Sequence, residues 1–219
     1  WENRRDGGSF RGEKGPLRGD FEAAMGQSGR RRSEVVRGTT VACLIADGGD
    51  FRSRPVDGLD LDFGGIAGDI HAGAMRKAGS REPWYPRGTP IRNNRQITLV
   101  GSEELAAVAA GMELPEIAPG WIGANLVTEG VPDVTRLPIG TRLIFSGAAV
   151  LFVEGENAPC RIAGRSIAEH YPGREGLDLL FPKIAIRRRG LIATVERPGR
   201  IARGETFTAR IPAPQKEEA

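Results

Sequence analysis

Cys160 is the residue best placed in the sequence to carry out chemistry. It follows Asn157-Ala158-Pro159, shortly after an apolar run that ends at Val153, so we expect it in a loop at the end of a strand. Arg161 and Arg165 follow closely, and their charge would stabilise a thiolate, which is both a nucleophile and a soft metal ligand. A half-buried structural thiol is the alternative that position alone leaves open.

The other cysteine, Cys43, lies in the apolar run of residues 41–45 and is expected to be a small core side chain. Two cysteines make no disulfide framework, so we expect reduced thiols and a cytoplasmic location. No apolar run approaches the roughly 18 residues that a membrane span requires, so a membrane partner is not expected.

The glycine-rich residues 64–71 contain a second candidate pair. If the chain is extended here, Asp69 and His71 share one face. Asp69 could then fix the tautomer of the imidazole, or both side chains could line a polar pocket. A satisfied structural pair is the alternative. His71 and His170 are the only histidines, which argues against a multi-histidine metal site.

Arginines supply a candidate anion site. Arg187, Arg188 and Arg189 stand before an expected strand, and each guanidinium offers a two-pronged donor for phosphate. Between residues 161 and 203, ten Lys or Arg residues face four acidic residues, which suits a phosphorylated small molecule or a nucleic acid. A solvated charged face is the alternative. Aromatic residues make up only 6%, which argues against a stacking platform for nucleic acid.

The elements that must hold these residues are short. The strands expected from apolar runs between turn residues are 39–46, 96–100, 141–145, 148–153, 191–195 and 206–211. Ser102 is expected to cap one helix that Gly111 ends, with Glu103 and Glu104 in its first turn. With 31 glycines and 15 prolines, the pattern predicts a mainly β protein, a compact β-barrel with a few short helices.

The two ends of the chain differ from its centre. Residues 1–36 are rich in glycine and basic residues and poor in apolar ones, so we expect a disordered basic head. Residues 37–213 form the expected barrel domain, and residues 214–219 a polar tail. No P-loop, dinucleotide-binding glycine fingerprint, G-x-S-x-G elbow or C-x-x-C pair is present, which removes several enzyme classes.

Several segments occur in an order that resembles the MOSC family, named for the C-terminal domain of molybdenum cofactor sulfurase. They are GIAGDIH at 65–71, RQITL at 95–99, GANL at 123–126, LPIGTRL at 137–143, APC at 158–160 and RGLIATV at 189–195, followed by GRI at 199–201. The similarity extends over about residues 39–211. Each motif alone is unspecific, whereas their common order is specific.

The resemblance implies a compact β-barrel with a cleft for the molybdenum cofactor, molybdopterin. Cys160 would ligate molybdenum or carry a transferable sulfur, and Asp69 and His71 would complete the catalytic set. The residues implied to hold the anionic pterin are Arg95, Asn125, Arg187, Arg188 and Arg189. No pyridoxal phosphate site is recognised in the sequence.

Two roles follow from the resemblance. The first is a molybdenum-dependent oxidoreductase component that reduces N-hydroxylated compounds with electrons from a partner reductase. The second is a sulfur or cofactor carrier without turnover, loaded by a separate cysteine desulfurase. A nucleic-acid-binding β-barrel is a third and weaker reading.

Overall fold

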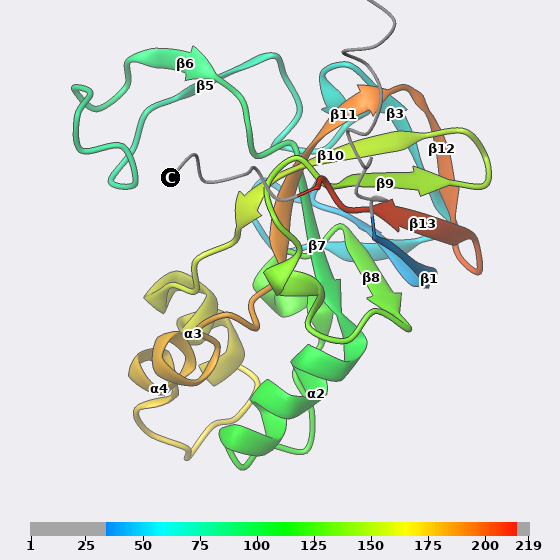
Figure 1. Ribbon diagram of the computed structural model, residues 1–219. Helices are drawn as coiled ribbons and strands as arrows, with labels where there is room; N and C mark the ends of the chain where they lie inside the picture. Colours follow the sequence, from blue (N-terminus) through cyan, green and yellow to red (C-terminus); the bar gives the residue numbers. More distant parts are fainter. Residues whose placement is uncertain (1–33, 214–219) are drawn as a thin grey trace, which may run out of the picture. The chain divides into compact units, whose positions relative to one another are not determined.

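The computed structural model describes residues 34–213, and a closed seven-stranded β-barrel forms their centre (Figure 1). The barrel strands are β1 (Val35–Ile45), β7 (Ile97–Gly101), β8 (Leu126–Glu129), β9 (Arg142–Phe145), β10 (Val150–Glu156), β11 (Leu191–Arg197) and β13 (Thr206–Arg210). They follow the order β13-β9-β10-β11-β7-β8-β1, and the pairing of β1 with β13 closes the ring. Only the β7–β8 pair is parallel among these neighbours. The expected mainly β barrel is confirmed.

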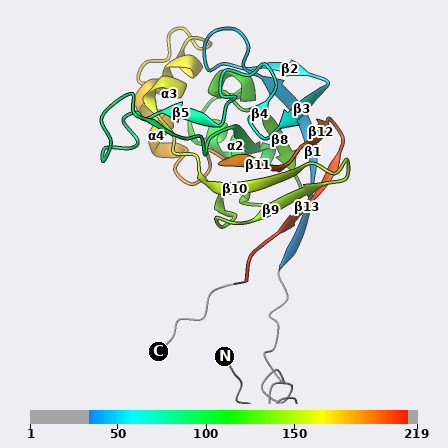
Figure 2. The same ribbon diagram turned by 90° about the horizontal axis from the view of Figure 1, so that it is seen from above.

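Alternating side chains explain why these segments form a barrel. In β9, Leu143 and Phe145 are buried and Arg142 is exposed, and in β13 Phe207 and Ala209 are buried between more exposed neighbours. Figure 2 shows β1 and β13 running side by side to the end of the barrel, where Val35 pairs with Arg210. The strand β1 therefore begins two residues before the expected domain start at residue 37.

Two smaller sheets and the short strand β2 lie outside the barrel ring. β2 (Arg54–Val56) pairs with the end of β1, and β3 (Gly58–Asp62) lies between β4 (Gly65–Ile66) and β12 (Gly199–Ala202). β5 (Met75–Lys77) and β6 (Pro90–Arg92) form a separate two-stranded arm that extends away from the barrel in Figure 1. The rest of the expected head and the expected tail lie outside the described residues.

Three α-helices of the described chain, α2 (Ser102–Gly111), α3 (Arg161–Ala168) and α4 (Leu177–Ile184), gather at one end of the barrel in Figure 1. Two 3-10 turns, η1 (Pro119–Ile122) and η2 (Val134–Arg136), precede β8 and β9 in the chain. A second core, with Val108, Met112, Ile167 and Phe181 fully buried, joins the three α-helices to the barrel. No helix within residues 34–213 has the length and apolar character needed to cross a membrane.

The helix α2 differs from its prediction at its start. Ser102 is the first helical residue, the cap position is Gly101, and no side chain caps the helix. The Ser102 hydroxyl instead donates to the Glu103 carboxylate over 3.2 Å. Gly111 is the last helical residue, close to the expected end. The sequence analysis did not predict α3 or α4, because eight residues are too few to show a clear helical period of apolar side chains.

Gly190 sets the path of the chain into β11 and provides a stability test. Its φ is +89°, and a Cβ there would lie 2.0 Å from the carbonyl oxygen of Leu99. We expect Gly190→Ala to lower the free energy of unfolding by about 3 kcal/mol, from overpacking and left-handed strain. Gly204→Ala is the matched control, since φ is +83° with nothing within 4 Å of the added Cβ. Equal urea midpoints for the two variants would contradict this prediction.

Candidate functional site

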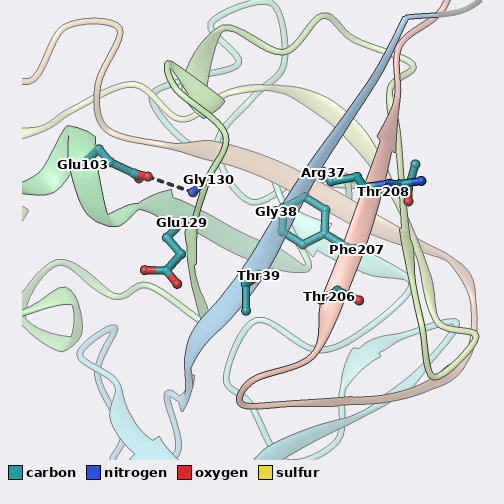
Figure 3. A pocket seen from close by; sticks show the side chains of 9 residues that line it. All are labelled: Arg37, Gly38, Thr39, Glu103, Glu129, Gly130, Thr206, Phe207 and Thr208. Carbon is teal, nitrogen blue, oxygen red and sulfur yellow. Dashed lines mark hydrogen bonds between the residues drawn. The ribbon is translucent and has the colours of Figure 1, made fainter.

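A cavity of about 730 Å³ lies where α3, the β5–β6 arm and the barrel meet. Its walls include His71, Arg95, Asn157, Cys160 and Arg189. These residues come from four separate stretches of sequence, and the volume is in the range of small-molecule and cofactor sites. A second hollow of about 580 Å³ lies between β1, β13 and the start of α2 (Figure 3), but it contains none of the predicted site residues.

Cys160 lies in the loop between β10 and α3, as the sequence predicted. It is a free, half-buried thiol at the cap position of α3, so the sulfur stands at the positive end of the helix dipole. Asn157 holds this loop. Its backbone N–H donates to the Gly190 carbonyl over 2.8 Å, and its side-chain oxygen accepts a 2.8 Å hydrogen bond from Arg95 Nη2.

Cys43 has the opposite environment. It is 1% exposed inside the barrel core, and burial raises the pKa of its thiol to about 11, with a further rise from the charge of Glu205. The prediction that Cys43 is a structural side chain is confirmed. Cys160 is therefore the one candidate reactive thiol in the described chain.

Two arginines bring positive charge to the thiol. Burial lowers the pKa of Arg95 to about 10, and the nearby charges of Arg81 and Arg76 lower it further. Burial also lowers the pKa of Arg189 to about 10, whereas the charge of Cys160 acts in the opposite direction. Arg81, Arg95 and Arg189 all line the cavity that contains Cys160, and Arg81 Nη2 donates to the Ala158 carbonyl over 3.3 Å, two residues before the thiol.

The Arg189 guanidinium is only partly satisfied. The residue is 7% exposed, and its Nη2 donates to the carbonyl oxygen of Ile122. Its Nη1 is buried and has no hydrogen-bond partner among residues 34–213. Buried donors in proteins are nearly always paired, so this donor, on a side chain that lines the cavity, is a candidate partner for an anion.

Arg161 and Arg165 do not supply this charge, which corrects the sequence-based prediction. Arg161 donates to the Asp178 carboxylate of α4 over 2.7 and 3.2 Å, and Arg165 is exposed. Neither residue lines the cavity. Arg187 and Arg188 are likewise exposed and lie outside the cavity wall.

Asp69 and His71 lie in a turn rather than in the extended segment that was considered, yet they interact directly. Asp69 Oδ1 accepts hydrogen bonds from the backbone N–H and the ring Nδ1 of His71, each 2.8 Å long. Asp69 Oδ2 accepts from the Ala46 N–H at 2.8 Å and from Asn125 Nδ2 at 2.9 Å.

The charge of Asp69 is maintained by these donors. Burial alone would raise the pKa of its carboxyl group, but the hydrogen bonds from His71 and Ala46 together lower it below the ordinary value. The ionised carboxylate accepts a proton-bearing Nδ1, which leaves Nε2 of His71 as the acceptor nitrogen. The His71 side chain lies on the cavity wall, with Asp69 buried behind it.

Asn125 is placed behind the cavity rather than on its wall. It is 1% exposed, its side-chain oxygen accepts from the Thr98 N–H at 3.0 Å, and its amide donates to Asp69. Asn125 thus connects β7 to Asp69 and orients the carboxylate.

Sequence reasoning missed Asn157 and the basic β5–β6 arm. Arg76 donates to Glu82 over 2.6 Å, and this bond, followed by one from the Gly79 N–H, lowers the pKa of Glu82 to about 2. The basic character of the arm could have been read from the sequence, since residues 74–92 contain five Lys or Arg residues and a single acid. Their approach to Cys160 requires the tertiary fold.

A closed β-barrel whose cavity wall holds a free thiol, a buried arginine and a half-buried one defines the class: a barrel with a thiol in its cavity. The family profile described as "MOSC domain" matches residues 68–208, and the chain belongs to that family.

Two proteins illustrate its relatives. The chain is 45% identical over 161 residues to YuaD of Bacillus subtilis, a protein named for metal-sulfur cluster biosynthesis, covering 74% of this chain and 84% of that protein. The crystal structure of YuaD superposes with a TM-score of 0.81 at 40% identity, over 83% of this chain and 100% of that one. YiiM from Escherichia coli, at 16% identity and a TM-score of 0.52 over 81% of this chain and 72% of that chain, shares the fold.

Proposed function

We propose that the chain binds the molybdenum cofactor through Cys160 and the arginines of the cavity. The observation that carries this proposal is the buried Arg189 guanidinium, whose Nη1 has no partner within residues 34–213, beside a free thiol. A thiolate is a soft ligand that suits molybdenum, and guanidinium groups suit the phosphate of the pterin. The cavity of about 730 Å³ is large enough for such a ligand.

The residues present fit the group in three respects. Cys160 would ligate the metal, Arg95 and Arg189 would hold the anionic part, and His71 would face the substrate with its Nε2. When bound, the cofactor would supply two-electron redox chemistry. His71, oriented by the buried Asp69, can then accept or deliver a proton at Nε2. We propose N-hydroxylated compounds as substrates, with electrons from a partner reductase.

Metal analysis tests this proposal. Protein purified from a host that makes the cofactor should contain stoichiometric molybdenum by inductively coupled plasma mass spectrometry, and Cys160→Ser should lose nearly all of it. Cys43→Ala is the matched control and should retain it, because Cys43 lies in the barrel core. Metal-free wild-type protein from that host would refute the ligand role. Reduction of a hydroxylamino-purine with a supplied reductant then tests turnover.

A sulfur or cofactor carrier is the second candidate. The similarity to a protein named for metal-sulfur cluster biosynthesis supports it, as does the free thiol on the cavity wall. In this role the chain would receive sulfur on Cys160 from a cytoplasmic cysteine desulfurase and pass it on. Bound molybdenum or protein-bound sulfur without any reduction of N-hydroxylated compounds would favour the carrier.

A further inference from the structure

We propose that Cys160 accepts sulfur directly from a small sulfane-sulfur oxyanion of the thiosulfate class, whose SO₃ end is held by Arg95 and Arg189. This inference rests on the proposed function only in taking Cys160 as the reactive group of the cavity. It removes the need for a partner desulfurase, because the donor is a small molecule that enters the cavity itself.

The charge balance of the cavity supports an oxyanion. Besides burial, the positive charges of Arg81 and its neighbours lower the pKa of Arg95 and of Arg189, whereas the charge of Cys160 raises both. Among the described residues that line the cavity, Glu82 is the one carboxylate, and it is already bonded to Arg76 and to the Gly79 N–H. Arg95 and Arg189 therefore have no free carboxylate of the cavity wall to pair with, and a small dianion would supply that charge.

The hydrogen-bond donors support the same ligand. Arg189 Nη1 is buried without a partner in residues 34–213, on a side chain that lines the cavity. Arg95 is fixed by its 2.8 Å bond to Asn157, three residues before the thiol. The loop that precedes Cys160 therefore contacts both segments: Asn157 accepts from Arg95 and donates its N–H to Gly190, which follows Arg189. These contacts preorganise the two cationic donors for an anion near the thiol.

The chemistry of transfer explains why an oxyanion donor fits better than a protein-bound persulfide. The Cys160 thiolate attacks the outer sulfur of thiosulfate, and a new sulfur–sulfur bond forms on Cys160. The sulfur–sulfur bond of thiosulfate breaks, and its electron pair leaves with sulfite. No proton, oxidant or reductant is required. Negative charge grows on the departing sulfite, where guanidinium groups stabilise it, whereas a thiol leaving group would make no use of them.

Labelled thiosulfate tests the transfer. The full chain, reduced and desalted, is incubated with thiosulfate carrying ³⁵S at its outer position. We expect one label per chain, located on Cys160 by peptide mass spectrometry, released by dithiothreitol and matched by an equal amount of sulfite. Cys43→Ala should load fully and Cys160→Ser not at all. We expect Arg189→Met to load about 100-fold more slowly, as for loss of a charged donor to a leaving group.

A second measurement separates anion recognition from thiol reactivity and from folding. Alkylation of Cys160 by neutral iodoacetamide should change only a few-fold in Arg189→Met, and circular dichroism should show a folded chain. If that variant is unfolded, Arg95→Met serves in its place. The proposal is overturned if Cys160 alkylates normally but takes no label, or if the arginine variants load like the wild type. Loading of a wild-type chain that is metal-free although purified from a host that makes the cofactor would refute the cofactor proposal alone, and bound molybdenum without loading would refute this one alone.

Discussion

Replacing Asp69 by asparagine is expected to lower the free energy of unfolding by about 3–5 kcal/mol, the usual result of removing one partner from a buried charged network. The Asp69 carboxylate is fully buried and accepts four hydrogen bonds, from Ala46, Asn125 and twice from His71. An asparagine amide has one acceptor oxygen, so its NH₂ group must face donors that it cannot satisfy.

The same carboxylate predicts the pH dependence of stability. Because the folded pKa of Asp69 lies below its ordinary value of 3.8, the ionised form contributes stability above that value. The contribution should be lost as the pH falls from about 4 through the lower folded pKa. Urea unfolding between pH 7 and pH 3 measures it, and Asp69→Asn should show a correspondingly flatter acid limb.

Asp60→Asn is the control for this measurement. Asp60 forms an exposed ion pair with Arg200, and exposed pairs contribute little to stability. Its unfolding midpoint should therefore match that of the wild type. An Asp69→Asn midpoint equal to that of Asp60→Asn would show that the buried network does not contribute to stability.

The barrel was largely predictable because its strands carry local signals. The apolar runs that became β1, β7, β9, β10, β11 and β13 alternate or are bounded by turn residues, and these signals act over a few positions. The short helices were not predictable in the same way. The helix α4 contains Pro182 in its interior and α3 spans two turns, so tertiary packing through Ile167 and Phe181 stabilises them rather than propensity.

The site was predictable only in part, for a related reason. Cys160, His71, Arg95 and Arg189 were named from the sequence, and the structure brings all four to one cavity. Their neighbours depend on contacts between distant positions: Arg95 and Asn157 are 62 residues apart. The arginines that follow Cys160 in sequence were misleading for the same reason: α3 places Arg161 against Asp178, and Arg165 is exposed.

Replacing Arg189 by methionine is the second change with a large expected effect, and it acts on binding rather than on folding. We expect the affinity for inorganic phosphate, used as an oxyanion probe, to fall about 10–100-fold in isothermal titration calorimetry, since a hydrogen bond to a charged group contributes about 1.5–3 kcal/mol. Arg188→Met removes an exposed charge of the adjacent residue and should change the affinity far less.

The stability of the same variant tells a binding role from a structural one. Methionine removes a buried cation whose Nη1 lacks a partner within residues 34–213, at the cost of the bond to the Ile122 carbonyl. Replacing a buried charge with an apolar side chain is often neutral or stabilising, so we expect a melting temperature equal to or above that of the wild type. A lower melting temperature with unchanged phosphate affinity would make Arg189 a structural residue. Weaker phosphate binding by a variant at least as stable as the wild type would mean that Arg189 serves ligand binding and not stability.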